Sequence, residues 1–270
     1  MRTERSSTPG ARKDWLWAFG NPKGSVIFHY SKTRHGENAT NALEDFQGVL
    51  QTDRFSCYGV LQKKSKILDV ACWAHCRRYF EKAKNESNRR TAFVLDLIQK
   101  LYAVERRARI AKLSSNDRAA LREQDAIPIL AELKRAIDEL ERSPRLSSVA
   151  LKTATEYALN HWEALTRYVS LGHVEIDNNL AENSIRPIAL GRKNYLFAGS
   201  ETGAEAGAVL YSLTESCRRF EIHPVEYLVH VFRELATRNR RDPEAWRDLT
   251  PARYRDRFGT IALDRSDDPS

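Results

Sequence analysis

Apolar residues follow two different patterns along the chain. In residues 14–73 they form short runs separated by Gly, Pro, Asn and Asp, which is typical of β-strands joined by turns. In residues 74–168 they recur every three or four positions, and this stretch contains no Gly and only Pro128 and Pro144. A period near 3.6 residues predicts helices. Gly172 ends this helical pattern.

The first part is predicted to alternate strands and helices. Its aromatic and β-branched runs predict two strands joined by a turn at 21–24, which together form a hairpin. The alternation as a whole favours an α/β sheet, and the block that follows it is predicted to be a bundle of three or four helices. The predicted elements before that block are strands at 15–19, 25–30, 48–53 and 67–73 and helices at 38–46 and 55–61.

Shorter helices are predicted for the rest of the chain. Asp177 is a predicted N-cap for a helix through Ile185, and Pro187 is expected to kink that helix. The charged stretch after Arg238 is expected to fray, and the polar residues 1–13 are expected to be a disordered lead-in. The other predictions are a turn or extended segment at 194–200 and helices at 205–219 and 223–235.

Composition changes this picture in one respect, which is charge. The 270 residues are 41% hydrophobic, as in globular proteins, and carry a formal net charge of +8 with a pI near 9.3. A basic protein of this kind suits a polyanionic partner such as nucleic acid, although the charge alone fits a merely soluble surface equally well. The chain has no apolar stretch of about 20 residues and no signal-peptide block at its start, so we expect a cytoplasmic protein.

The four cysteines are too few and too scattered for a disulfide framework, and they are interpreted as reduced thiols. Cys72, His75 and Cys76 are close in sequence but lack a second pair of ligands, so we expect no zinc. His75 is interpreted as a packed core residue. Trp15 and Trp17 are interpreted as sheet packing rather than base stacking.

Two acids stand where a metal site could form. Asp53 ends a predicted strand, and Glu182 lies in the second turn of a predicted helix about 129 residues later. Paired carboxylates on a strand end and a packed helix can bind two Mg²⁺ ions, which prefer oxygen ligands. Each acid taken alone is more simply a turn residue or a surface acid favoured by the helix dipole.

The sequence around these acids is more specific than their spacing. Five strings follow one another along the chain: LQTDRF at 50–55, CWAHCRRYF at 72–80, IDNNLAENSIRP at 176–187, GRKNYLFAGS at 191–200 and HPVEYL at 223–228. In this order they closely resemble transposases of the insertion-sequence family sixty-six. The resemblance covers roughly residues 14–250.

This resemblance implies a fold and a chemistry. The fold is α/β, an RNase H-like catalytic core formed by 14–73 plus 171–219, with a large all-helical insertion at 74–170 and a short helical C-terminal segment and tail at 220–270. The chemistry is DNA cleavage and strand transfer at insertion-sequence ends by a DDE triad. Asp53 would be the second acid and Glu182 the third, with Mg²⁺ as the metal and Mn²⁺ as a substitute.

The chain also departs from the family, whose members carry a first Asp on an upstream strand and amino-terminal DNA-binding modules. Upstream of Trp15 the only acids are Glu4 and Asp14, and neither lies in an apolar strand. We therefore expect an amino-terminally truncated transposase that is inactive alone. The alternative is a non-catalytic remnant that binds DNA or a partner, such as full-length transposase or accessory proteins of the element, in a bacterial cytoplasm at the nucleoid.

Basic and amide residues near the acids complete the predicted site. Arg77, Arg78, Arg186, Arg192 and Lys193 lie in or beside the quoted strings, and we predict that they contact DNA phosphates. The doublets at 89–90 and 106–107 are interpreted as solvated helix faces. The supporting residues are Asn178, Asn179 and Asn183, which either hold the carboxylate and backbone geometry or cap the helix.

Overall fold

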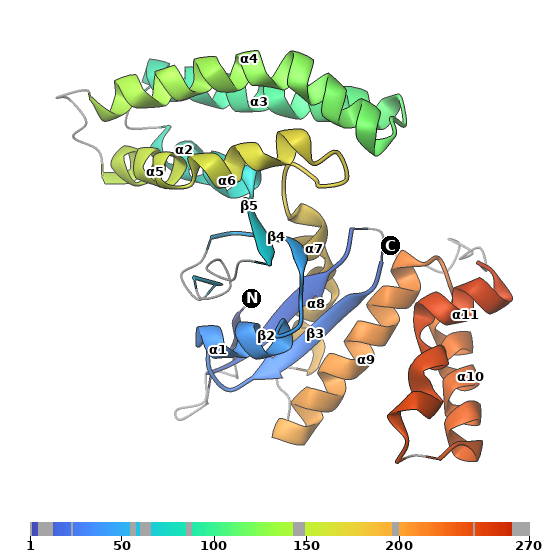
Figure 1. Ribbon diagram of the computed structural model, residues 1–270. Helices are drawn as coiled ribbons and strands as arrows, with labels where there is room; N and C mark the ends of the chain where they lie inside the picture. The colour runs from blue at the N-terminus through green and yellow to red at the C-terminus, as the bar shows by residue number, and fades with distance from the viewer. Residues whose placement is uncertain are drawn as a thin grey trace. The chain divides into compact units, whose positions relative to one another are not determined.

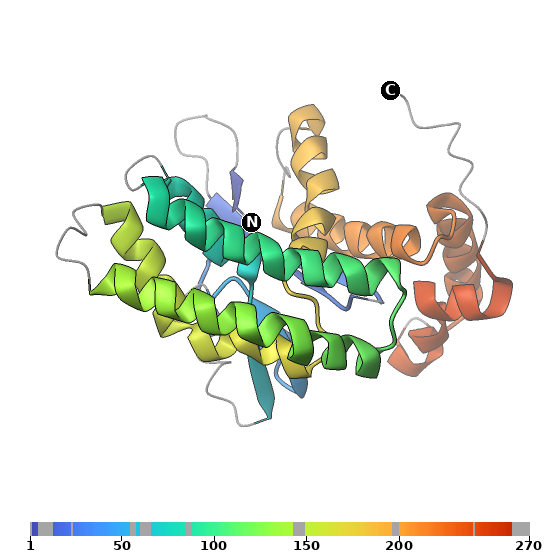
Figure 2. The same cartoon turned by 90° about the horizontal axis from the view of Figure 1, so that it is seen from above.

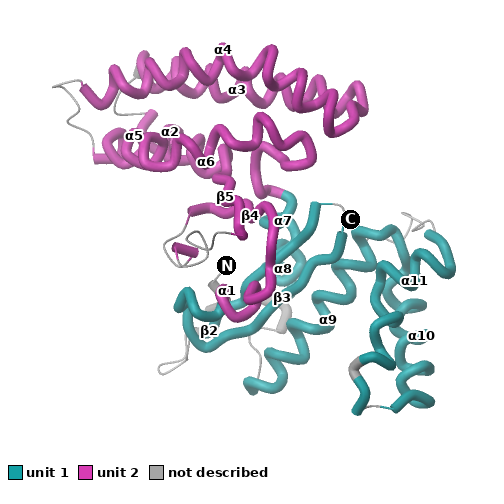
Figure 3. The backbone as a smooth tube through the Cα atoms, in the orientation of Figure 1, with its two compact units in different colours: residues 1–38, 180–270 teal, residues 39–179 magenta. Residues whose placement is uncertain are grey.

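The protein is described here by a computed structural model, in which the chain divides into two compact units (Figures 1 and 3). One unit comprises residues 1–38 and 180–270, and the other comprises residues 39–179. The structure describes residues 2–4, 13–22, 24–54, 58–59, 66–84, 88–142, 149–195, 200–239 and 241–260.

The first unit begins with a three-stranded antiparallel sheet of β1 (Arg2–Glu4), β2 (Lys13–Gly20) and β3 (Val26–Ser31). The predicted hairpin is confirmed, and its turn is closed by a 3.1 Å hydrogen bond from the Asn21 N–H to the Ser25 carbonyl. Residues 2–4 differ from the expected disordered lead-in because they pair with β2, where backbone groups supply partners regardless of side-chain polarity.

Helix α9 (Glu201–Arg219) lies along the other edge of this sheet (Figure 1). Two serine hydroxyls of α9 accept hydrogen bonds from backbone N–H groups of β3, Ser212 from Phe28 at 2.8 Å and Ser216 from Val26 at 3.0 Å. These bonds satisfy backbone donors that the edge strand β3 would otherwise leave unpaired. The predicted helix at 205–219 is confirmed with an earlier start.

The helical run that carries the third string is interrupted at Ile185, two residues before the kink that was predicted at Pro187. It forms α7 (Asn179–Ser184) and α8 (Arg186–Tyr195), and Pro187 occupies the first turn of α8, where its missing N–H costs nothing. The predicted extended segment at 194–200 is wrong at its start, because Asn194 and Tyr195 end α8. Residues 196–199 lie outside the described residues.

Helix α10 (Pro224–Thr237) is followed by a 3-10 helix, η4 (Pro243–Leu249), and by α11 (Pro251–Phe258). The start of α10 was predicted correctly. The expected fraying after Arg238 is wrong, since the Arg238 guanidinium pairs with Glu234 at 2.6 Å and also with Asp248. The Tyr227 hydroxyl donates a 2.6 Å hydrogen bond to the Leu249 carbonyl and so joins η4 to α10.

The second unit contains most of α1 (Gly36–Ala42) and a parallel pair of strands, β4 (Gly48–Thr52) and β5 (Ile67–Ala71). Both strands were predicted, but Trp73 begins a helix instead of ending β5. Helix α1 starts and ends earlier than the predicted 38–46, so Phe46 lies beyond it. Most of the predicted helix at 55–61 lies outside the described residues.

The predicted helical block is confirmed (Figure 2). Trp73, Phe80, Leu97 and Leu133 are fully buried in its core. Its elements are α2 (Trp73–Ala83), α3 (Asn88–Ile110), α4 (Ser115–Glu141), α5 (Val149–Asn160), α6 (Trp162–Thr166) and the 3-10 helix η3 (Arg167–Ser170).

The division into units differs from the predicted one. We expected all strands to form one core with 171–219 and the helical block to be an insertion. Instead the described strands form two sheets, and Val70 and Ala71 of β5 are buried in the same apolar cluster as the helices. Short strands with an apolar face join whichever helices bury that face, and for β5 these are the helices of the block.

Candidate metal and nucleic-acid site

Asp53 is the first residue after β4 and is half-buried at the carboxyl end of the parallel pair, as predicted. Its backbone is held on both sides. The Tyr157 hydroxyl donates to the Asp53 carbonyl at 3.3 Å, and the Arg54 N–H donates to the Thr52 hydroxyl at 3.2 Å. These bonds fix the direction in which the chain leaves the strand.

Arg54 has a backbone φ of 61°, a left-handed conformation that favours glycine. Its guanidinium forms an ion pair with the buried Asp69 carboxylate and donates to His161 Nδ1 at 3.3 Å. Arg167 donates to the Asp69 carbonyl at 2.7 Å. Burial, and then the charge of Arg54, lower the pKa of His161, so its imidazole is neutral and can accept this hydrogen bond at neutral pH.

This cluster was not predicted from the sequence. Asp69 and His161 lie 15 and 107 residues from Arg54 in sequence, and no local pattern joins them. The conformation of Arg54 has no sequence signal either, because the residue present is not the glycine that would have indicated it.

The segment 174–178 is bound across the carboxyl ends of β4 and β5. The Trp73 N–H donates to the Ile176 carbonyl at 3.2 Å, and the Asn178 N–H donates to Cys72 Sγ at 3.4 Å. Burial raises the pKa of the Cys72 thiol to about 11, so it accepts this bond as a neutral thiol. The backbone leading into α7 is therefore anchored at the carboxyl end of β5, the parallel neighbour of the strand that precedes Asp53.

A buried arginine of the helical block holds the same segment from the other side. Arg122 is completely buried and binds the Glu105 carboxylate at 2.7 Å. Its remaining donors bind the carbonyls of Tyr168, Leu171 and Val174 at 2.6, 3.0 and 2.8 Å. The sequence could have indicated Glu105, because this acid occupies a position where the 3.6-residue period of α3 places apolar residues.

Arg118 extends this network to the loop. It donates to Glu105 and, at 2.8 Å, to Glu175 Oε1. This hydrogen bond lowers the pKa of Glu175. The backbone of Glu175 is itself bound, because the Gln51 side chain donates to its carbonyl at 2.8 Å. Helical block, loop and β4 are thus connected by hydrogen bonds.

Asp177, the predicted N-cap, lies one residue before the N-cap position of α7, but its carboxylate still binds the start of this helix. Its carboxylate accepts bonds from the Asn179 backbone N–H at 3.1 Å and from the Asn179 side chain at 2.9 Å. The half-buried Tyr102 also donates to it through its hydroxyl at 2.9 Å. Asn179 therefore serves the helix cap. Asn178 is half-buried and its amide oxygen is buried with no hydrogen-bond partner among the described residues, whereas Asn183 is exposed.

Glu182 is half-buried in the first turn of α7. The helix is fixed on its other side by Arg219 of α9, which donates to the Leu180 carbonyl at 3.1 Å and to the Ser184 hydroxyl at 2.8 Å. Asp53 belongs to the unit of residues 39–179 and Glu182 to the other unit. Their joint binding of a metal therefore stays a prediction.

The predicted DNA-contacting residues differ in their surroundings. Arg77 and Arg78 are exposed on α2, where Arg77 pairs with Glu81 at 3.0 Å and Arg78 lies 3.3 Å from His75 Nε2. Arg186 is exposed at the start of α8. The side chains of Arg192 and Lys193 lie outside the described residues.

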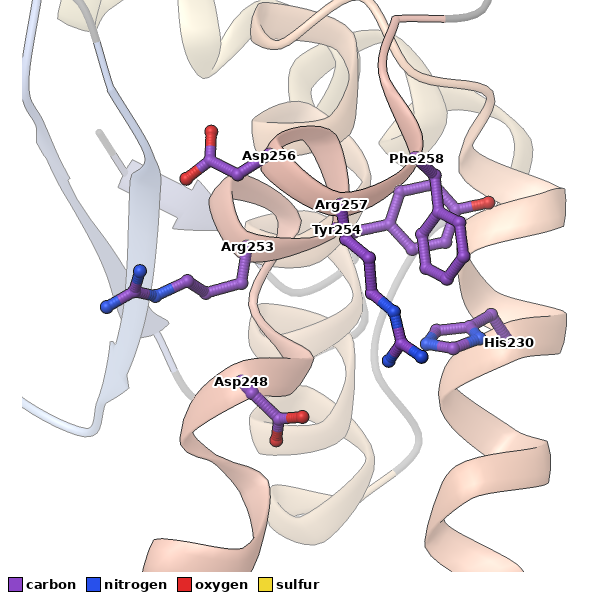
Figure 4. Close-up of a pocket in the computed structure, with 7 residues that line it drawn as sticks. All are labelled: His230, Asp248, Arg253, Tyr254, Asp256, Arg257 and Phe258. Atoms are coloured by element: carbon purple, nitrogen blue, oxygen red, sulfur yellow. The ribbon is translucent and has the colours of Figure 1, made fainter.

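Within the described ranges, no three His, Cys, Asp or Glu side chains are grouped so as to hold one metal ion. No described helix is long and apolar enough to cross a membrane. A hollow of about 270 Å³ lies beside α10 and α11 (Figure 4). It is lined by His230, Asp248, Arg253, Tyr254, Asp256, Arg257 and Phe258.

Comparison with known proteins matches the family described as "Transposase IS66 family" over residues 3–206. Similar curated proteins come from Sinorhizobium fredii (strain NBRC 101917 / NGR234). Uncharacterized protein y4jD is 31% identical over 220 residues, which is 79% of this chain and 42% of that protein. Uncharacterized protein y4qI is 31% identical over 242 residues, 83% of this chain and 44% of that protein. The chain thus spans less than half the length of these relatives, and no solved structure matches it.

Proposed function

This chain belongs to the IS66 family of transposases, and from that premise we propose that it carries metal-dependent chemistry on DNA as part of a transposase. The reaction would be phosphodiester cleavage and strand transfer at the ends of an insertion sequence. The observation that carries the proposal is the anchoring of the backbone that leads into α7, the helix of one candidate acid, at the carboxyl end of β5, the parallel neighbour of the strand that precedes the other acid.

The two acids are proposed to bind the same metal. The Asn178 N–H is bound to Cys72, the residue that directly follows β5, and β5 is the parallel neighbour of β4. From Asn179 to Glu182 is one helical turn, and side chains three apart on a helix lie about 5–6 Å from each other. This short separation along the chain, between the anchored Asn178 and Glu182, supports a shared metal site for Asp53 and Glu182.

The donor set fits a hard divalent cation. Both proposed ligands are carboxylates, which suit Mg²⁺ and its substitute Mn²⁺. When bound, the metal would polarise the phosphate and activate the attacking water or hydroxyl. Asn179 keeps α7 capped through Asp177, and Asn178 and Asn183 are proposed to support the carboxylate geometry.

The fold of the catalytic part is proposed to be RNase H-like. The features that support this are the antiparallel hairpin of β2 and β3, the parallel pair of β4 and β5, and an acid at the carboxyl end of β4. Ligand sites in sheets with parallel strands commonly lie at such carboxyl ends.

DNA is the proposed partner, through both the element's ends and the target. Arg77, Arg78 and Arg186 are exposed and are proposed to bind phosphates together with Arg192 and Lys193. A guanidinium binds phosphate with paired hydrogen bonds and carries no base specificity in doing so. The protein is proposed to act in the bacterial cytoplasm at the nucleoid, together with full-length transposase or accessory proteins.

The isolated 270-residue chain is proposed to be inactive by itself. A two-metal reaction needs a ligand that bridges both ions, and two carboxylates leave the second ion poorly held. In a nicking and strand-transfer assay with Mg²⁺ and with Mn²⁺, we expect no turnover. Robust cleavage that is lost in Asp53→Asn would overturn this part and make Asp14 the next residue to substitute.

Metal binding tests the site itself. Titration of the intact chain with Mn²⁺, followed by its electron paramagnetic resonance signal, should show weak binding that both Asp53→Asn and Glu182→Gln reduce. The double variant should lose no more than the stronger single variant, because one shared ion is lost once. Glu139→Gln, on the exposed face of α4, is the control. Independent, additive losses would show two separate sites and refute the proposal.

A further inference from the structure

Helix α10 presents an apolar stripe to solvent. Val225 is 61% exposed, Val229 42% and Phe232 62%, and the exposed Ala236 continues the row. The spacings of four, three and four residues place these side chains on one face of a helix. The buried Tyr227 and Val231 face the opposite way, into the apolar cluster of the same unit.

Two opposite charges flank this stripe on the same side. Glu226 and Arg233 each follow a stripe residue by one position, and both are exposed. Neither forms an ion pair with another residue in the described ranges. On the far side of the stripe, Leu228 and Leu235 are partly buried against the core. The stripe therefore has one charged border and one apolar border.

We propose that this face of α10 is a self-association surface, on which the α10 helices of two copies of the chain pack antiparallel about a two-fold axis. The axis would pass between Val229 and Phe232, the centre of the stripe. This two-fold rotation reverses the direction of the helix in the second copy. The charged borders of the two helices nevertheless lie on the same side of the interface. Glu226 of one copy then lies beside Arg233 of the other, and symmetry makes this ion pair twice.

The charges select this orientation over the parallel one. In a parallel pair each charged border would face the partner's leucine border, and neither charge would gain a partner. The charged border of α10 is also left exposed by the rest of the chain. His230, the next residue around the helix beyond Glu226 and Arg233, is already packed on Tyr254 and Phe258 of α11 at ring distances of 5.3 and 5.1 Å (Figure 4). The proposed surface stops where that packing begins.

A single pair of such helices makes a small interface. Stable specific interfaces bury roughly 1,200–2,000 Å², and a helix of 14 residues contributes one exposed face. The dimer is therefore weak, with a dissociation constant on the order of micromolar. This association is independent of metal binding and of catalysis.

Sedimentation of the intact chain over a range of concentrations provides the first test. The chain has a mass of 31.0 kDa, and we expect reversible conversion to a species of twice that mass. Phe232→Glu should abolish the dimer and leave the circular dichroism spectrum and melting temperature unchanged. Ile110→Glu, which alters a side chain 76% exposed on α3, is the matched control and should leave the dimer intact.

Charge reversal tests the orientation. Glu226→Arg alone and Arg233→Glu alone should each weaken the dimer by about tenfold, because each places like charges together twice. The double variant Glu226→Arg with Arg233→Glu restores both pairs and should return the affinity to within about threefold of the original. A chain that stays monomeric at high concentration, or a double variant no better than the single ones, would overturn the proposal.

Discussion

At the scale of single residues, Arg54 combines an unfavourable backbone conformation with a favourable side-chain environment. Its φ of 61° disfavours any residue with a Cβ, while its guanidinium neutralises the buried Asp69. Arg54→Ala should destabilise the fold by about 2–4 kcal/mol, because it leaves that carboxylate poorly paired. Arg54→Gly should cost about 1 kcal/mol less, because glycine relieves the strain.

Urea unfolding of both variants measures these differences. Arg142→Ala, which removes an exposed arginine after α4, serves as the control and should change stability by less than about 0.5 kcal/mol. If the glycine and alanine variants were equally stable, the left-handed conformation at residue 54 would be contradicted.

His161 gives this cluster a pH dependence. Its pKa in the folded chain is lowered by burial and by Arg54, so the unfolded chain binds this proton more readily than the folded chain does. The stabilisation is therefore complete above the unfolded pKa of about 6.5 and is lost as the pH falls through the lower folded pKa. Urea midpoints at pH 7.5 and pH 5.5 should differ more for the original chain than for His161→Asn. Equal differences would show that another group dominates this window.

At the scale of elements, prediction succeeded where the period of apolar residues was sufficient. Strands β2 to β5 and the helical block were found because short apolar runs and a 3.6-residue period are local signals. The elements after Arg238, η4 and α11, were not predicted because they are short and charged. They are held by tertiary contacts such as that of Arg238 with Glu234. Asp53 was placed correctly because a strand end is also local, whereas its neighbours Asp69 and His161 come from distant segments.

The loop of residues 171–178 depends on an element that is far from it in sequence. Arg122 of α4 binds three of its flanking carbonyls together with Glu105. Arg122→Leu should destabilise the chain by about 3–5 kcal/mol, since it removes one of the two arginine partners of the buried Glu105 carboxylate and leaves these carbonyls without this donor. Arg135→Leu, an exposed change on the same helix, should change stability by less than about 0.5 kcal/mol.

Hydrogen exchange of this variant distinguishes a local effect from a global one. Faster exchange should be largest at the Asn178 amide, which is bonded to Cys72. A stability close to that of the original chain would contradict the assigned role of Arg122.

At the scale of the whole molecule, the boundaries between units could not be predicted from the sequence. The boundary falls within α1 and within α7, between residues 38 and 39 and between residues 179 and 180. Periodicity identifies elements but not which apolar faces meet, and β5 joined the helical block because Val70 and Ala71 are buried there. The metal hypothesis requires the two units to act together through α7, which both share.

DNA binding belongs to this scale as well, because phosphates are recognised by the charge of an entire face. Affinity should fall with salt, and each lost phosphate contact should reduce the slope of log affinity against log salt by about 1. Arg77→Ala with Arg78→Ala should therefore reduce the slope by about 2 for any DNA sequence. The control removes the same charge from the same unit with Arg106→Ala and Arg107→Ala, where Arg107 already pairs with Asp125. Fluorescence anisotropy between low and moderate salt measures both slopes. Equal reductions for the two doublets would show that net charge, and not the surface of α2, determines the binding.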